Sequence, residues 1–133
     1  MIDNTQIAEI MTKEVVLVEA NDLIREIEDT FGNYSLRHAP VLSDGELVGM
    51  ISLVDIQRVN DSPLDELVDT SKGLVARSFM TPNPISVQLS ATIREVATLF
   101  IEQDFHAIPV LDGDKIVGIV TTTDIIRYFL EEE

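Results

Sequence analysis

The sequence predicts a mixed α/β (α+β) fold that is built from one structural unit used twice. Three observations support this fold class. The chain matches itself without a gap when residues 11–58 are laid over residues 80–127, a shift of 69 positions. Helical and strand-like apolar patterns follow in the same order in both copies. In each copy, two apolar runs are joined by Asp and Gly, which is a strong hairpin signal.

Each copy is predicted to run helix, strand, helix, strand, strand, helix. Asn21 and Ser90 occupy positions typical of helix N-caps, and an amphipathic run follows each of them. These two runs are the expected second helices. The other expected bounds, first copy then second, are 5–11 and 71–80 for the first helix, 15–18 and 85–87 for the first strand, 39–42 and 108–111 for the second strand, 46–51 and 115–120 for the third strand, and 54–59 and 123–130 for the last helix.

The repeat also predicts the domain organisation. We expect a first repeat over residues 1–60, a linker over 61–70 that contains Asp61-Ser62-Pro63, and a second repeat over 71–133. A three-stranded sheet with its flanking helices buries its faces poorly when it stands alone. The two repeats are therefore expected to pack face to face with pseudo-twofold symmetry around a shared core.

Composition and charge exclude several functions. Asp and Glu number 24 against 9 Lys and Arg, which gives a formal net charge of −15 without a basic stripe, so nucleic-acid binding is not expected. No signal peptide or membrane-length apolar run is visible, and there is no cysteine. These features predict a cytoplasmic protein that does not contact membranes.

The sharpest motif lies where the hairpin's last strand meets the final helix. It reads Gly49-x-x-Ser52-x-x-Asp55 in the first copy and Gly118-x-x-Thr121-x-x-Asp124 in the second. One interpretation is a capping box, in which the hydroxyl caps the helix and the acid reaches back to the cap's own N–H. The other is nucleotide binding, with the carboxylate accepting hydrogen bonds from a ribose diol and the helix N-terminus facing phosphate.

The order Met-Thr, apolar strand, helix, X-Pro-Val, hairpin and Gly-x-x-Ser/Thr-x-x-Asp resembles the CBS domain, the regulatory module named after cystathionine β-synthase. The resemblance covers nearly the whole chain in two copies. It implies a regulatory module that binds AMP, ADP or ATP (with or without Mg²⁺), or S-adenosylmethionine, in clefts between paired repeats. It also implies a homodimer and a separate effector protein, with no catalytic cofactor.

The same resemblance assigns residues to two clefts. In each, the Asp would hold ribose, apolar residues would sandwich adenine, backbone near Ala39 or Ile108 would read the base edge, and Arg37, His38 or His106 would meet phosphate. The first cleft would comprise Ser52, Asp55, Arg37, His38, Ala39, Asn83, Pro84 and Ile85. The second would comprise Thr121, Thr123, Asp124, His106, Ile108, Val15, Val16 and Leu36.

Arg58 and Arg127 lie three residues after each Asp on the same helix face, and they could reach phosphate or be ordinary solvated residues. Val54 stands where the second copy has Thr123, and Glu14 stands where it has Asn83, so unequal clefts are expected. These departures keep an alternative open, a dimerisation or interaction scaffold that binds no nucleotide. No nucleophile–base pair, Gly-rich phosphate loop or metal-ligand cluster is visible, so neither an enzyme nor a metal protein is expected.

Overall fold

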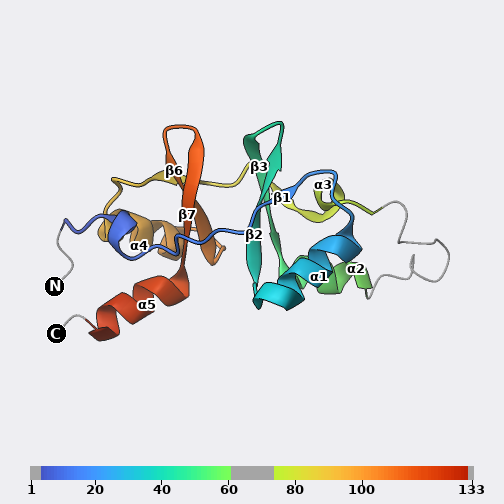
Figure 1. The fold of residues 1–133 in the computed structure, drawn as a ribbon. Coiled ribbons are helices and arrows are strands. Elements are labelled where there is room, and N and C mark those ends of the chain that lie inside the picture. Colours follow the sequence, from blue (N-terminus) through green and yellow to red (C-terminus); the bar gives the residue numbers. More distant parts are fainter. Residues whose placement is uncertain (1–3, 61–73, 132–133) are drawn as a thin grey trace. The chain divides into compact units, whose positions relative to one another are not determined.

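The computed structural model describes residues 4–60 and 74–131, which form two compact units (Figure 1). The central unit is the continuous stretch Val16–Pro84, and the terminal unit combines the chain up to Val15 with the chain from Ile85 onward. These units differ from the two sequence repeats, because the N-terminal segment of each repeat is grouped with the remainder of the other repeat. The expected linker at 61–70 lies outside the described residues.

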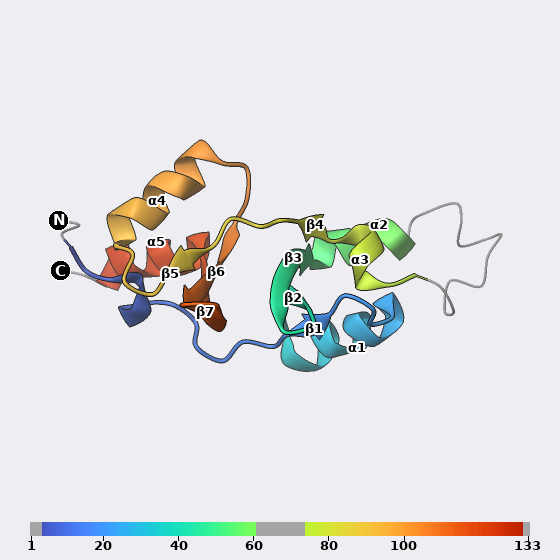
Figure 2. The same ribbon diagram turned by 90° about the horizontal axis from the view of Figure 1, so that it is seen from above.

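The central unit contains a sheet in the order β1-β2-β3-β4, and Figure 2 shows this order. Strand β1 is parallel to β2, and the other neighbours are antiparallel. The helices α1 and α2 follow β1 and β3 in the chain. The bounds of the elements are β1 Val18–Glu19, α1 Ile24–Tyr34, β2 His38–Ser43, β3 Glu46–Ser52, α2 Leu53–Asn60, α3 Ala76–Phe79 and β4 Thr81–Pro82.

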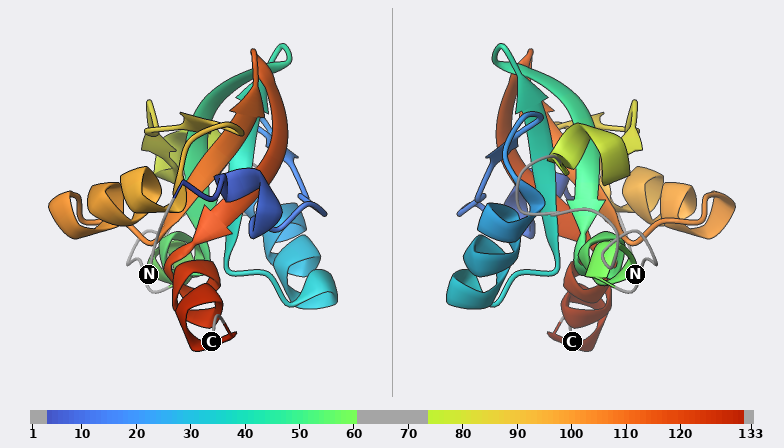
Figure 3. Two further views of the ribbon diagram at one scale, coloured as in Figure 1. Left: turned by 90° about the vertical axis from the view of Figure 1, so that its left-hand side faces the viewer. Right: turned by 90° about the vertical axis from the view of Figure 1, so that its right-hand side faces the viewer.

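The terminal unit repeats this plan with a sheet in the order β5-β6-β7. Strand β5 is parallel to β6, and β6 and β7 form an antiparallel hairpin. Helix α5 follows directly from the end of β7 (Figure 3). The bounds are η1 Ile7–Glu9, β5 Val87–Gln88, α4 Ile93–Glu102, β6 Ala107–Asp112, β7 Lys115–Thr121 and α5 Thr122–Glu131.

The prediction of a three-stranded sheet holds for the terminal unit and is wrong for the central unit. Residues Thr81–Pro82 pair with Met50 and Gly49 as a fourth strand, and the Asn83 N–H continues along the same edge by donating to the Val48 carbonyl at 3.1 Å. In the terminal unit the equivalent contact is a single bridge between Thr12 and Ile119. The chain thus runs further along β3 than along β7.

The N-caps expected at Asn21 and Ser90 are also wrong. Helix α1 begins after Leu23, and α4 begins after Thr92, whose hydroxyl accepts a hydrogen bond from the Glu95 N–H in a complete capping box. Asn21 and Ser90 instead lie in the turns that follow β1 and β5. The first helical N–H groups bond to distant backbone: Ile24 donates to the Leu74 carbonyl and Ile93 to the Thr5 carbonyl, each at 2.9 Å.

The hairpins and last helices agree with the prediction to within a residue or two at each end. Positive φ at Asp44 (53°) and Gly45 (82°) turns the first hairpin, and Gly113 (65°) serves the second. Each hairpin carries a register shift at the same place, after Val41 and after Val110. Each unit has its own apolar core: one around Ile27, Phe31, Val41, Ile51 and Ile56, the other around Ile7, Ile93, Val96, Val110 and Val120.

Candidate functional site

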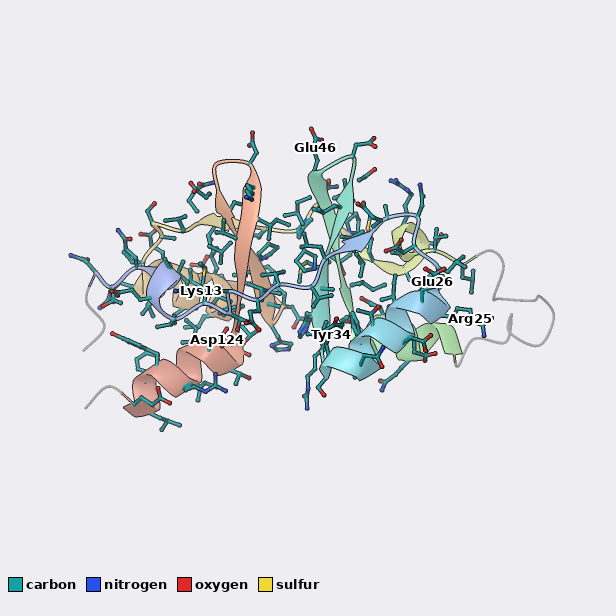
Figure 4. All side chains as sticks on the ribbon, in the orientation of Figure 1. Lys13, Arg25, Glu26, Tyr34, Glu46 and Asp124 are labelled. Carbon is teal, nitrogen blue, oxygen red and sulfur yellow. The ribbon has the colours of Figure 1, made fainter. Side chains whose placement is uncertain are left out.

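Two aspartates lie at the start of the last helices, and they are the charged residues that are buried within the described part of the chain. Asp55 is 8% exposed at the start of α2. Asp124 is 7% exposed at the start of α5, and Figure 4 labels it there. A buried carboxylate is costly unless its oxygens are hydrogen-bonded. The surroundings of these two side chains therefore define the candidate sites.

The capping-box interpretation of the motif is confirmed in both units. In the central unit, the Ser52 N–H donates to Asp55 Oδ2 at 2.8 Å and the Asp55 N–H donates to Ser52 Oγ at 3.1 Å. In the terminal unit, Thr121 and Asp124 make the same two bonds at 3.0 and 3.1 Å. The negative charge lies at a helix N-terminus, where the helix dipole favours it. The cap fixes each carboxylate in one orientation and leaves acceptor capacity unused, since an ionised carboxylate offers about four lone-pair sites.

An arginine three residues after each aspartate faces its carboxylate. Arg58 Nη2 lies 3.5 Å from Asp55 Oδ1, and Arg127 Nη1 lies 3.6 Å from Asp124 Oδ1. The arginine side chains are 71% and 59% exposed, so each pair contributes little to stability. A guanidinium has five N–H donors, and this ion pair occupies few of them. Each site therefore presents acceptor and donor groups side by side.

The glycine of the motif has a packing role that the sequence analysis did not assign. A Cβ at Gly49 would overlap the Met80 side chain and lie 3.0 Å from the Thr81 carbonyl oxygen. A Cβ at Gly118 would lie 2.5 Å from Met11 Sδ and 2.9 Å from the Thr12 carbonyl oxygen. Glycine is thus needed so that the Met-Thr segment can lie against the strand. The duplicated Met-Thr and the duplicated glycine therefore form one structural contact, which occurs once in each unit.

In the central unit, the hairpin of β2 and β3 brings Arg37, His38 and Ala39 close to the start of α2, whereas β4 runs away from it along β3. The Arg37 carbonyl accepts a hydrogen bond from the Leu53 N–H at 2.8 Å, and His38 pairs with Ser52 across the hairpin. Ala39 is fully buried opposite Ile51. Asn83 has a left-handed backbone with φ of 51° and follows β4. Pro84 ends this unit, and Ile85 belongs to the terminal unit.

In the terminal unit, the hairpin of β6 and β7 brings His106 and Ile108 close to the start of α5 in the same way. The His106 carbonyl accepts a hydrogen bond from the Thr122 N–H at 3.0 Å, and Ile108 pairs with Val120. Thr123 is exposed on the first turn of α5. The remaining predicted residues divide between the units: Val15 belongs to the terminal unit, whereas Val16 and Leu36 belong to the central unit.

The structure adds residues around Asp124 that the sequence analysis missed. Thr12 Oγ1 lies 3.5 Å from Asp124 Oδ2, a long contact between residues 112 positions apart. A pocket of about 400 Å³ adjoins this carboxylate, and its lining is Glu9, Ile10, Asp124, Arg127, Tyr128 and Glu131. The duplicated Met-Thr is the sequence pattern that could have pointed to Thr12. No sequence pattern indicates the pocket, because its walls come from both ends of the chain.

The described residues form neither a metal site nor a membrane-spanning helix. No group of three or more His, Asp or Glu side chains is placed to hold a metal ion among residues 4–60 and 74–131. Over the same ranges, no helix is both long and apolar enough to cross a membrane.

Fold and site together define a duplicated α/β module with one buried, helix-capping aspartate in each copy. The CBS domain family model matches residues 7–62 and 76–131, and the chain belongs to this family. It is 32% identical to the uncharacterised protein MJ1426 of Methanocaldococcus jannaschii over 91% of this chain and 89% of that protein. It spans 32% to 48% of the length of three longer uncharacterised proteins of the same organism.

Solved structures confirm the tandem CBS fold. The complex of CBSX2 from Arabidopsis thaliana with AMP has a TM-score of 0.80 at 26% identity, covering 96% of this chain and 97% of that one. The CBS domain pair of protein MJ0100, in complex with 5′-methylthioadenosine and S-adenosyl-L-methionine, has a TM-score of 0.82 at 25% identity, covering 98% and 100%.

Proposed function

We propose that this chain is a regulatory module that binds an adenine nucleotide, AMP, ADP or ATP, and thereby controls a partner protein. The observation that carries the proposal is the buried carboxylate at a helix N-terminus, fixed by a cap and faced by an arginine, which occurs once in each unit. AMP in CBSX2 and the adenosyl compounds in MJ0100 support the ligand class.

Each group in the site has a role in this proposal. The aspartate accepts hydrogen bonds from the two ribose hydroxyls, since its unused lone pairs match a diol. Arg58 or Arg127, together with Arg37, His38 or His106, meets the phosphate. A triphosphate brings more negative charge and is expected to need Mg²⁺ in this acidic chain. The chain itself performs no catalysis.

The proposal also covers the assembly and its setting. The module acts as a homodimer in the cytoplasm, and occupancy of its sites is read by an effector protein. The formal net charge of −15 argues against nucleic acid as the partner, because phosphate backbones are repelled by such a field.

The test is calorimetry with AMP, ADP, ATP with and without Mg²⁺, and S-adenosylmethionine. We expect two sites per chain, one lost in Asp55→Asn and the other in Asp124→Asn. Affinity at the altered site should fall about 10- to 100-fold, because a hydrogen bond to a charged group is worth about 1.5–3 kcal/mol. Asparagine keeps one acceptor oxygen, so the helix cap is weakened less than it would be by alanine.

Thr92→Ala is the matched control, since it removes a capping box at α4 in the unit that holds Asp124. The free energy of unfolding of Thr92→Ala should fall, whereas its nucleotide binding should remain. Unchanged affinity in the Asp55→Asn/Asp124→Asn double variant would refute the ribose role. If the wild-type chain binds none of these ligands, and its melting temperature does not rise with them, the interaction-scaffold function is favoured instead. A ligand at 100 times its Kd should stabilise the fold by about 2.7 kcal/mol.

A further inference from the structure

The pocket beside Asp124 carries more negative charge than the capped aspartate alone would give it. Its volume of about 400 Å³ lies within the roughly 300–1,000 Å³ that is typical of small-molecule sites. One wall comes from η1 and its C-cap Ile10 and the other from α5, so the whole pocket belongs to the terminal unit. Glu9 and Glu131 join Asp124 in the lining, and Arg127 is the basic residue among the described lining residues. Three carboxylates against one guanidinium leave the pocket acidic.

The central repeat has neither of the two added acids. At the shift of 69 positions, Ser78 stands in place of Glu9, and Ser62 stands in place of Glu131. The CBS family model matches residues 7–62 and 76–131 at this same shift, so both positions lie inside the repeat. The capped aspartate and its arginine are present in both copies. The two sites therefore share their common groups and differ in charge beside them.

The added carboxylates favour an ammonium group over a phosphate. Glu9 and Glu131 are exposed, so water and salt weaken their field, but it still acts on a ligand within a Debye length of about 8 Å. A metal ion is not the expected cation, because no three His, Asp or Glu side chains are placed to hold one within residues 4–60 and 74–131. An organic ammonium group needs no such convergence, since it can donate hydrogen bonds to single carboxylates.

The pocket also has groups for the other parts of such a ligand. Arg127 Nη1 lies 3.6 Å from Asp124 Oδ1, which leaves most of the guanidinium N–H donors for an anionic group such as a carboxylate. Tyr128 is half-buried in the lining, and its hydroxyl lies 3.5 Å from Thr5 Oγ1. An aromatic ring attracts a cation that lies over its face. A carboxylate and an ammonium group on one short chain are the charged groups of an amino acid.

We infer that the terminal site takes an adenosyl compound whose 5′ substituent is an amino acid chain, whereas the central site takes an adenosine phosphate. The inference rests on the proposed function, because it keeps the Asp124 carboxylate on the ribose. Arg127 binds the carboxylate of the amino acid, and Glu9 or Glu131 binds its ammonium group. Glu9 and Glu131 are thus the residues that determine specificity, and Asp124 serves either class of ligand.

The test is calorimetry on Asp55→Asn, in which the central site is weakened so that the titrations report on the terminal site. S-adenosylmethionine should bind at least about tenfold more tightly than AMP. Adding Glu9→Gln and Glu131→Gln should weaken S-adenosylmethionine about tenfold and tighten AMP about fivefold, because a neutral amide neither attracts an ammonium group nor repels a phosphate. Changes of opposite sign for two ligands are not expected from a purely structural effect.

Two controls accompany these variants. Glu102→Gln removes the same charge from an exposed position at the end of α4, outside the pocket lining, and should leave both affinities unchanged. The second control is 5′-methylthioadenosine, which has the adenosine but no amino acid group. It should bind the terminal site with the same affinity before and after the two glutamates are replaced, which shows that the site is still folded.

The outcomes separate this inference from the proposed function. If Asp55→Asn binds AMP as tightly as S-adenosylmethionine, or if Glu9→Gln/Glu131→Gln leaves the ratio of the two affinities unchanged, the inference is overturned and the proposed function stands. An equal change of that ratio in Glu102→Gln would also overturn it, because the effect would then come from net charge rather than from the pocket. If the wild-type chain binds none of the three compounds, both the inference and the proposed function fail.

Discussion

The central and terminal units carry the same capped aspartate but differ on the outer surface of their helices. The bonds between cap and carboxylate agree to within 0.2 Å, from 2.8 and 3.1 Å in one unit to 3.0 and 3.1 Å in the other. At the helical surface, by contrast, Gln57 faces solvent where Ile126 does in the other unit. The shared groups are those on which the proposed ligand site depends. The differing groups lie on the exposed surface of the last helices.

The largest expected effect tests the contact that the two units share. Gly118→Ala and Gly49→Ala should each lower the free energy of unfolding by about 1–3 kcal/mol, because the new methyl group meets a methionine side chain and a backbone oxygen. Urea denaturation measures this. Gly32→Ala is the control, since a Cβ there has no atom within 4 Å and alanine favours the helix. A loss at only one of the two glycines would show that the units are less alike than their geometry indicates.

The next prediction sharpens a difference between the first long helices of the two units. Thr92→Ala should cost about 1 kcal/mol, because it removes a hydroxyl that caps α4. Helix α1 begins after Leu23 without a side-chain cap. Leu23→Thr therefore removes no cap, and the stability of the central unit should not fall for that reason. Thermal unfolding followed by circular dichroism compares the two variants. Equal stability of Thr92→Ala and the wild type would refute the role of the capping box.

The smallest expected effect concerns charge near the two aspartates. Glu9 lines the pocket beside Asp124, and Ser78 stands at the equivalent sequence position in the other repeat. Glu9→Ser should tighten AMP binding at the terminal site about two- to threefold, since it removes a partly screened repulsion of phosphate. Ser78→Glu should weaken binding at the central site by a similar factor. Calorimetry measures the AMP affinity of both variants. An unchanged AMP affinity in Glu9→Ser would contradict this prediction.

Local patterns were sufficient for the hairpins and for the cap at each aspartate. The signals at Asp44-Gly45 and at Ser52-x-x-Asp55 act within a few residues, where turn and cap chemistry dominate. The N-cap expected at Asn21 is wrong because α1 begins after Leu23 without a side-chain cap, whereas the cap of α4 is itself a local pattern, Thr92-x-x-Glu95, two residues after Ser90. The first N–H groups of α1 and α4 bond to the carbonyls of Leu74 and Thr5, which lie far away in the chain. A side-chain preference could not reveal these partners.

The sequence by itself determined the duplicated α/β plan, the hairpin and last helix of each copy, and the position of the capped carboxylate that follows each hairpin. These features depend on hydrophobic period, turn residues and contacts over three or four positions. Only the tertiary structure decided that Met11-Thr12 packs on Gly118 and Met80-Thr81 on Gly49, that the central sheet has a fourth strand, and that a pocket forms beside Asp124. These contacts join segments that are distant in the chain, as Thr12 and Asp124 are at 112 positions apart, and their formation depends on chain closure and packing, which local pattern does not encode.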